Sequence, residues 1–292
     1  MKSRILMPSQ SKTTVSRFVP GLILYCLCSP ALAEEKPPSR AHYLANAGTM
    51  IEHGNSKIAF DPLFRNDFGT YDLVPADIEA AFMAGAPPWD GIDAVFISHH
   101  HEDHFDPALI LKLLKTQTDM ELYAPEQAAD AIRAIVADPD NPVLKRVHGL
   151  DIEYGAPSID IELGSIFIEA IGIPHSGWPI HHKHLENIVF RITLDDEATV
   201  MHFGDADAND EHFAKNPDHW KKRHTHFAMP PFWFYLSDEG RRILDDRINA
   251  THTIGVHVPR KLPDDPESRS NELQEVDLFR RQGETRNITV TN

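Results

Sequence analysis

The stretch AVFISHHHEDHFDP, residues 94–107, joins an apolar run directly to a cluster of polar side chains. The eight residues from His99 to Asp106 include four histidines, one glutamate and two aspartates. The apolar residues before them are typical of a strand buried on both faces. Asp106 and Pro107 are typical of a helix N-cap and first turn. The cluster is therefore expected in a loop between a strand and a helix.

A histidine-rich loop is often only polar surface, but the order of residues in this one indicates a metal site. His99, His101 and Asp103 alternate, so in extended backbone their side chains can converge on one side. His104 then points the other way and can serve a second ion nearby. Imidazole and carboxylate groups suit zinc, and also iron or manganese. The zinc-binding helix motif H-E-x-x-H does not fit, because Glu102 does not directly follow the first of two histidines four residues apart.

Strand and helix patterns alternate along the rest of the chain. Strands are expected at residues 41–48, 49–54, 57–64, 91–98, 121–125, 165–175, 187–194, 198–205 and 251–259. Helices are expected at residues 108–117, 128–138 and 238–249. The polar stretch from Arg260 predicts one helix and a loose tail. This order favours a layered α/β sandwich in a single domain, residues 34–292.

The first 33 residues have the pattern of a cleaved signal peptide. Lys2, Arg4, Lys12 and Arg17 form a basic region without acidic residues, and a short apolar segment follows. The sequence SPALA then ends in the small residues that precede cleavage, so we expect cleavage after Ala33. The apolar segment is too short to serve comfortably as a membrane anchor. We therefore expect an exported protein without a stable membrane anchor, most simply a periplasmic one and otherwise a secreted one.

Charge and cysteine content exclude some ligands, nucleophiles and partners. Both cysteines lie in the leader, so the mature chain has no disulfide and no thiolate ligand or nucleophile. Removing the leader takes away four basic residues and no acidic one, which changes the net charge from −16 to −20. Such a surface repels phosphate backbones and argues against a nucleic-acid partner. A small-molecule or lipid-like substrate fits better.

The loop resembles the signature of a known family of hydrolases. HHHEDH, residues 99–104, contains the H-x-H-x-D-H motif of the metallo-β-lactamase fold. AFDPLF, around Asp61 and Pro62, is similar to the early turn of the branch with sugar-lactone hydrolases and N-acyl-phosphatidylethanolamine phospholipase D. The resemblance covers most of the mature chain. It implies a four-layer αββα sandwich with two metal ions at one edge of the two sheets.

Further ligands are expected just after strands that end at that edge. His175, Asp205 and His257 each follow or end an apolar run, and Gly204 permits a tight turn before Asp205. By the resemblance, one ion is held by His99, His101 and His175. The second ion is held by Asp103, His104 and His257. Asp205 bridges the two ions. His202 and His252 lie at strand positions that favour packing or a supporting role.

The ligand set implies hydrolysis of an ester, lactone, amide or phosphodiester bond. Two divalent ions, most simply Zn²⁺ with iron or manganese as alternatives, would hold a metal-bridging hydroxide as the nucleophile. Asp103 would relay its proton and Asp205 would hold both ions. β-Lactam hydrolysis is disfavoured, because enzymes with that activity generally lack an aspartate at the bridging position. The alternative is a non-catalytic exported metal-binding or scavenging protein, which would tend to close its metal sites with protein ligands.

Two segments are candidates for contacts with the substrate. HSGWPIHHKHLEN, residues 175–187, begins at an expected ligand and supplies Trp178 and His184. MPPFWFYLSDEG, residues 229–240, has four consecutive aromatic side chains, including Trp233. With an alternating pattern, half of this aromatic run packs in the core and half can line a cleft beside the metals. A lined cleft favours an apolar or acyl-bearing substrate.

Overall fold

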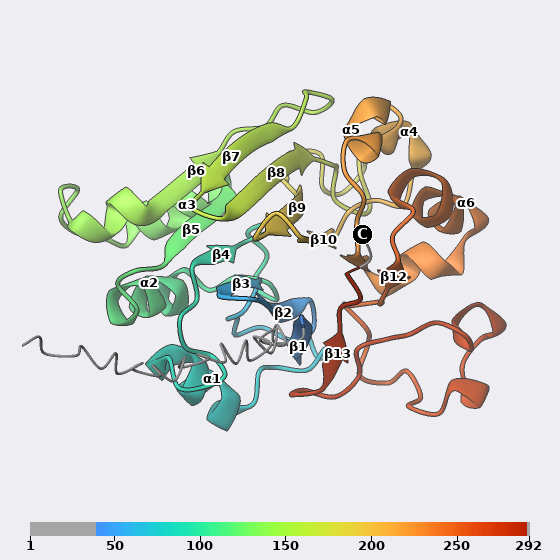
Figure 1. Cartoon of the computed structure of the whole chain (residues 1–292), viewed down its shortest axis with the longest axis horizontal. Coiled ribbons are helices and arrows are strands. Elements are labelled where there is room, and N and C mark those ends of the chain that lie inside the picture. The colour runs from blue at the N-terminus through green and yellow to red at the C-terminus, as the bar shows by residue number, and fades with distance from the viewer. Residues whose placement is uncertain (1–38, 291–292) are drawn as a thin grey trace, which may run out of the picture. The chain divides into compact units, whose positions relative to one another are not determined.

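The computed structural model describes residues 39–290, which form two β-sheets and the helices that flank them (Figure 1). The expected leader, residues 1–33, lies outside the described residues. Sheet 1 has the strand order β13-β1-β2-β3-β4-β5-β6, and sheet 2 has the order β12-β11-β10-β9-β8-β7. Within residues 39–290, no helix is both long and apolar enough to cross a membrane.

Each sheet combines antiparallel and parallel strands. The strands of sheet 1 are β1 (Arg40–Ala45), β2 (Gly48–His53), β3 (Ser56–Phe60), β4 (Ala94–Phe96), β5 (Glu121–Pro125), β6 (Val147–Leu150) and β13 (Thr285–Asn287). The strands of sheet 2 are β7 (Ile159–Leu163), β8 (Ile166–Gly172), β9 (Ile188–Leu194), β10 (Ala198–His202), β11 (Phe227–Met229) and β12 (His252–Thr253). Strands β3 to β6 are parallel, so β3, β4 and β5 end at the same edge of sheet 1.

Helices cover the outer face of each sheet. The helices on sheet 1 are α1 (Ala76–Ala84), α2 (Pro107–Thr116) and α3 (Glu126–Ala134). Those on sheet 2 are α4 (Asp210–Phe213), α5 (Pro217–Lys221), α6 (Asp238–Arg242) and the π-helical η3 (Ile243–Ile248). Short 3₁₀ turns complete the set: η1 (Pro142–Arg146), η2 (Phe232–Leu236), η4 (Pro266–Ser268) and η5 (Asn271–Leu273).

Three apolar clusters lie between these layers and confirm the expected αββα sandwich. One lies between α1–α3 and sheet 1, a second between the two sheets, and a third between sheet 2 and its helices. Between the sheets, the ring of Phe96 on β4 lies 5.1 Å from that of Phe190 on β9. Burial of apolar side chains on both faces of each sheet supplies most of the stabilisation of such a fold.

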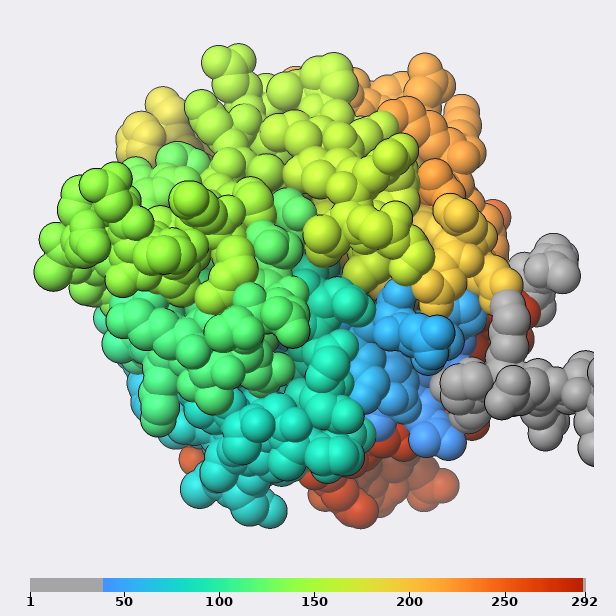
Figure 2. Space-filling view, turned by 60° about the vertical axis from the view of Figure 1, so that its left-hand side comes forward, coloured from blue at the N-terminus to red at the C-terminus, as the bar shows by residue number. Residues whose placement is uncertain are grey.

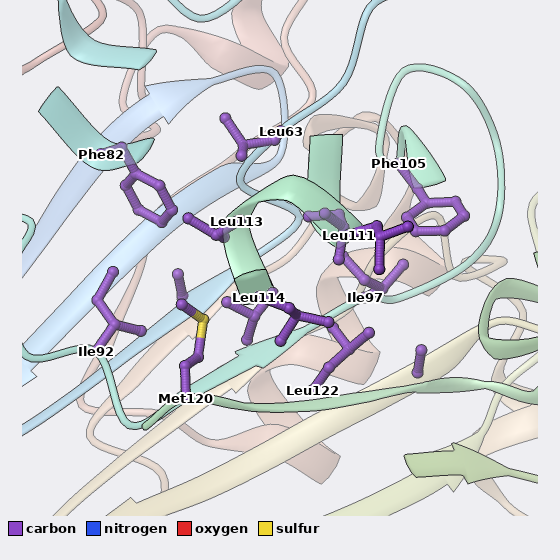
Figure 3. Packing of buried hydrophobic residues seen from close by; sticks show 14 of the residues in the cluster. Leu63, Phe82, Ile92, Ile97, Phe105, Leu111, Leu113, Leu114, Met120 and Leu122 are labelled. Atoms are coloured by element: carbon purple, nitrogen blue, oxygen red, sulfur yellow. The ribbon is translucent and has the colours of Figure 1, made fainter. Parts of the chain in front are cut away.

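The first apolar cluster holds both ends of the loop after β4. Ile97 precedes the loop and Phe105 follows it, and both are buried. Figure 3 shows Phe105 and Ile97 beside Leu111 of α2 in this cluster. At the start of α2, the Asp106 carboxylate accepts a hydrogen bond from the Leu109 amide at 2.8 Å, as the N-cap pattern predicts. The loop is therefore fixed at both ends.

The strand expected at residues 91–98 is shorter in the structure. Only Ala94–Phe96 pairs as β4. The Ser98 amide instead donates to the Asp61 carboxylate at 2.7 Å, because the chain turns toward the site at that residue. The strand expected at residues 251–259 is likewise reduced to β12, which is followed by isolated bridges at Gly255 and Val256. His257 has a φ of 59°, so the extended chain ends there.

The stretch from Arg260 onward differs from the expected helix and loose tail. It forms η4, η5 and strand β13, which pairs antiparallel with β1 at the edge of sheet 1. Leu278 and Phe279 are buried, and the Phe279 ring stacks on Tyr43 at 4.9 Å. The sequence did not reveal these buried side chains, because they are few and widely spaced in a polar stretch.

The turns at the far end of the strands join the two sheets away from the polar loops. The β2–β3 turn lies beside the β9–β10 turn, where the blue and yellow surfaces meet in Figure 2. There Ser56 Oγ donates to Asp195 Oδ1 at 2.9 Å. The opposite ends of these strands carry the site.

Candidate metal centre

Seven histidine and aspartate side chains from four loops converge at one edge of the sandwich. Four follow β4, and one each follows β8, β10 and β12. They form two groups in which one ligand atom per residue lies within 4.8 Å of the others: His99, His101, His175 and Asp205; and Asp103, His104 and His257. The structure thus brings together all seven residues that the sequence and the resemblance singled out.

Asp205 lies between the two groups. Its Oδ1 is 3.2 Å from His104 Nε2 and 3.3 Å from His257 Nε2. Its Oδ2 is 3.3 Å from His175 Nε2. One carboxylate oxygen therefore faces each group, which is the arrangement that a bridging ligand needs.

The buried carboxylate of Asp61 organises the loop after β4. It accepts hydrogen bonds from Ser98 N at 2.7 Å and Ser98 Oγ at 2.6 Å. It also lies 2.8 Å from His104 Nδ1. Because the carboxylate accepts the Nδ1 proton, the Nε2 lone pair of His104 is directed toward Asp205 and Asp103. The sequence placed Asp61 in a turn but did not reveal this role.

Two other histidines are held in the same tautomer. Ser98 Oγ donates to Asp61, so its lone pair accepts the Nδ1 proton of His99 at 3.0 Å. The Nδ1 proton of His175 is donated to the backbone carbonyl of Ser176 at 2.7 Å. In both residues Nε2 is then the nitrogen without a proton, and that of His99 lies 3.2 Å from His101 Nδ1. Such supporting contacts orient an imidazole toward a metal.

The Asp205 loop is shaped by one glycine and one amide. Gly204 has a φ of 55°, and a Cβ there would lie 2.5 Å from Asn187 Oδ1 and 2.5 Å from Ser98 Cβ. Asn187 accepts a hydrogen bond from the Asp205 amide at 3.0 Å and donates to the carbonyls of Ile173 and Phe203. The side chain of Asn187 thereby joins the strand ends that carry His175 and Asp205.

His257 is fixed through Asn46. Its amide donates to the Asn46 carbonyl at 2.9 Å, and Asn46 Nδ2 donates to the Asp103 backbone carbonyl at 3.0 Å. Both Asn46 and His257 have a positive φ. Two aromatic rings flank His257, that of Tyr71 at 4.2 Å and that of Trp233 at 5.2 Å between centroids.

Burial and mutual charge set the protonation of these groups. Burial, followed by the nearby His104, holds the pKa of His99 well below its usual range. Burial and His175 lower the pKa of His101 to about 4. Burial alone would raise the pKa of Asp205, but His257 and His104 outweigh it and lower that pKa well below its usual range. At neutral pH His99 and His101 are neutral and Asp205 is ionised, as metal binding requires. Burial would lower the pKa of His104 and His257, but the nearby carboxylates of Asp205 and Asp103 outweigh it and raise both, so metal binding at these two residues would release protons.

The donor atoms fit a pair of divalent ions. Within residues 39–290, five buried atoms of the cluster have no hydrogen-bond partner: His104 Nε2, His175 Nε2, His257 Nδ1, His257 Nε2 and Asp205 Oδ1. Buried polar atoms of this kind are costly unless another group satisfies them. Imidazole nitrogen and carboxylate oxygen at two adjacent positions suit Zn²⁺, and iron or manganese as well.

The two histidines that we expected outside the ligand set lie outside both groups. His202 is buried and stacks on Phe60, and its Nε2 donates to the Ala47 carbonyl at 3.0 Å. His252 is paired with Asp277, with 3.0 Å between His252 Nε2 and Asp277 Oδ2. Both side chains have structural partners, in agreement with a packing role.

The expected substrate contacts fall into two places. Trp178 and His184 line a cavity of about 150 Å³ that borders Pro174 and Asn187, next to the strand ends carrying His175 and Asp205. Trp233 instead packs against His257, and its Nε1 donates to the Ala206 carbonyl at 3.1 Å.

The aromatic run differs from the alternating strand that we expected. It forms the 3₁₀ turn η2, in which Phe234 and Tyr235 are buried while Phe232 and Trp233 are partly exposed. Adjacent residues therefore share an environment, which the three-residue period of a 3₁₀ turn allows and an alternating strand does not.

Sequence reasoning missed two polar side chains beside the cluster. The His182 ring lies 4.4 Å from that of His175 and 5.3 Å from that of His101. The Tyr71 ring lies 4.2 Å from that of His257, and burial, followed by the charges of Asp205 and Asp103, raises the pKa of Tyr71. His182 was one of several histidines in its segment, and no pattern marked Tyr71.

Comparison with known proteins agrees with this geometry. Residues 40–218 match the model of a family described as "Beta-lactamase superfamily domain". Six of the seven converging residues lie in the matched part, and His257 lies beyond it. No curated protein matches the sequence.

Several solved structures share the fold at low sequence identity. Igni18, a metallo hydrolase from the archaeon Ignicoccus hospitalis, has 17% identity and a TM-score of 0.57 over 87% of this chain and 100% of its own. An isothiocyanate hydrolase from Delia radicum gut bacteria has 15% identity and a TM-score of 0.57 over 85% and 98% of the two chains. The short form of human tRNase Z has 12% identity and a TM-score of 0.53 over 86% and 100%.

Proposed function

Since the chain belongs to the β-lactamase superfamily domain family, we propose that it is a dinuclear metal-dependent hydrolase. We also propose that it is exported, on the leader pattern of residues 1–33. The observation that carries the proposal is the convergence of seven nitrogen and oxygen ligands in two adjacent groups with Asp205 between them. His99, His101 and His175 would hold one ion, and Asp103, His104 and His257 the other. Zinc fits this donor set best, with iron and manganese as alternatives.

Bound divalent ions would supply an activated water at neutral pH and polarise the bond under attack. Asp103 is the chain's own candidate for moving the proton of that water. Burial would raise its pKa, but the neighbouring His104 and His257 outweigh burial and lower it. The carboxylate is therefore ionised at neutral pH and can accept a proton at Oδ2, which lies 3.2 Å from His257 Nε2.

The substrate that we propose is a small or lipid-like molecule with an ester, lactone, amide or phosphodiester bond and an apolar part. The cavity of about 150 Å³ next to the ligand-bearing strand ends supports the apolar part, because Ile152, Ile173 and Trp178 line it. His184 would provide a polar contact at that cavity, and Trp233 would contact substrate beside His257. The net charge of −16 supports a small substrate over a nucleic acid.

Hydrolysis by the metal-loaded protein tests this proposal. A panel of esters, lactones, amides and phosphodiesters is assayed with zinc-loaded wild type, His175→Ala and the control His252→Ala, which alters a histidine outside both groups. We expect turnover of at least one class by wild type and by the control, and loss of it in His175→Ala. Bound metal without any turnover would contradict the proposal and favour the non-catalytic metal-binding protein.

A further inference from the structure

The two aromatic residues that flank His257 differ in one respect. Trp233 Nε1 already donates to the Ala206 carbonyl at 3.1 Å, so its donor is occupied. The hydroxyl of Tyr71 forms no hydrogen bond with any residue between 39 and 290. Tyr71 is partly exposed, and its ring meets that of His257 edge-on at 75°, with 4.2 Å between the centroids. An unused donor therefore lies beside the metal centre.

The backbone around Tyr71 is fastened to the loop that carries His257. Arg260, three residues after His257, donates from its amide to the Thr70 carbonyl at 2.9 Å. Its Nη2 donates to the Tyr71 carbonyl at 2.6 Å and to Asp67 Oδ2 at 2.9 Å. These contacts fix the position of Tyr71 relative to the His257 loop.

The same segment is fastened to the loop that carries the histidine cluster. The Asn66 amide donates to the Glu102 carbonyl at 3.2 Å, and Asn66 Nδ2 donates to Glu102 Oε2 at 2.7 Å. Tyr71 is thus held between two loops that carry ligands, and its place does not depend on a substrate. A donor fixed in advance is what stabilisation of a developing charge requires.

We propose that the Tyr71 hydroxyl donates a hydrogen bond to the substrate oxygen that gains negative charge when water attacks the scissile carbonyl or phosphoryl group. The inference rests on the proposed function and adds a catalytic residue to it. Water adds to the carbon or phosphorus, the bond to the leaving oxygen or nitrogen breaks, and the leaving atom is protonated from the attacking water. Tyr71 keeps its own proton throughout, because a phenol is a donor at neutral pH.

Binding of inorganic phosphate, a tetrahedral oxyanion, gives a readout that does not depend on turnover. Calorimetric titration compares zinc-loaded wild type, Tyr71→Phe and the control Tyr123→Phe, which removes a hydroxyl on β5 from a ring stacked on His148. We expect Tyr71→Phe to retain its metal and its melting temperature but to bind phosphate about tenfold more weakly, because a hydrogen bond to a charged acceptor is lost. The control should bind phosphate as wild type does.

Several outcomes would overturn this inference. Equal phosphate affinity in Tyr71→Phe and wild type would exclude the hydrogen bond. Loss of metal in Tyr71→Phe would make Tyr71 part of the metal-holding structure, and metal-loaded wild type without phosphate affinity would exclude the oxyanion site. A wild type that binds no metal is a different result, since it refutes the proposed function itself.

Arg260 enters the same inference as a positioning residue, and a double-mutant comparison tests that role. Arg260→Ala should weaken phosphate binding in the presence of Tyr71 and add no further loss to Tyr71→Phe, because the two act through one hydrogen bond. Additive losses would show that Arg260 attracts phosphate by its own charge and would refute the positioning role.

Discussion

At the scale of single residues, the chemistry of the candidate site depends on side chains that are not ligands. Asp61, Ser98 and Asn187 are buried and hold ligand-bearing segments by hydrogen bonds. Each makes contacts with segments distant in sequence, so no local pattern announces its role. The ligands themselves were predictable, because a dense histidine motif and residues that directly follow strands are visible in the chain.

The substitution Asp61→Asn tests this support directly. The oxygen of the introduced amide could still accept from Ser98, but its nitrogen, facing His104 Nδ1, would move the imidazole proton to Nε2 and block that ligand atom. We expect metal affinity to fall about 10- to 100-fold, measured by competition with a chelating dye. Asp93→Asn is the matched control, since the Asp93 carboxylate accepts from the Lys57 amide at 2.8 Å at the start of β4, the end opposite to the ligand loop. Unchanged affinity in Asp61→Asn would contradict this role.

His219 on α5 makes stability depend on pH. Burial, followed by the charge of Arg191, lowers the pKa of His219 to about 3. The unfolded chain takes up this proton near pH 6.5 and the folded chain only near pH 3, so stability falls as the pH drops through that window. Between pH 7 and pH 5, we expect the free energy of unfolding to fall by about 2 kcal/mol less in His219→Leu than in wild type.

Urea denaturation at the two pH values measures this difference, with a chelator in every sample so that metal release does not contribute. An equal fall of the free energy of unfolding in wild type and His219→Leu would show that the buried imidazole does not cause the loss of stability at low pH.

At the scale of elements, residues typical of helix ends predicted element boundaries better than apolar patterns predicted strand lengths. Asp106 and Pro107 located the start of α2, and Pro107–Thr116 is the helix that the structure shows. The strand expected at residues 251–259 was too long, because the backbone turn at His257 depends on its contact with Asn46. Strands β6, β7 and β11 were missed, since the first two are short edge strands and the third has three residues.

The N-cap of α2 gives a prediction at this scale. Asp106→Ala removes the side-chain acceptor for the Leu109 amide. We expect the free energy of unfolding to fall by about 1 kcal/mol in urea denaturation. The exposed Asp140→Ala serves as the control and should unfold as wild type does. An unaffected midpoint in Asp106→Ala would mean that packing of the apolar cluster alone fixes the start of the helix.

At the scale of the whole molecule, the site is a consequence of how the two sheets face each other. The ends of β4, β8 and β10 meet at one edge, and the turns between β2 and β3 and between β9 and β10 meet at the other. The order of strands and helices, together with the motif, was sufficient to predict this sandwich. The C-terminal stretch was not predictable, because its pairing with β1 rests on a three-residue strand and a few buried side chains.

The measurement that tests the central claim most directly is the metal content of the purified protein after reconstitution, for wild type, Asp205→Ala and the control Asp207→Ala. We predict about two ions per chain for wild type and the control, and a clear loss in Asp205→Ala, because its carboxylate faces both groups of ligands. Two ions retained without the Asp205 carboxylate would contradict the bridging role. A wild type that binds no metal would contradict the metal centre itself.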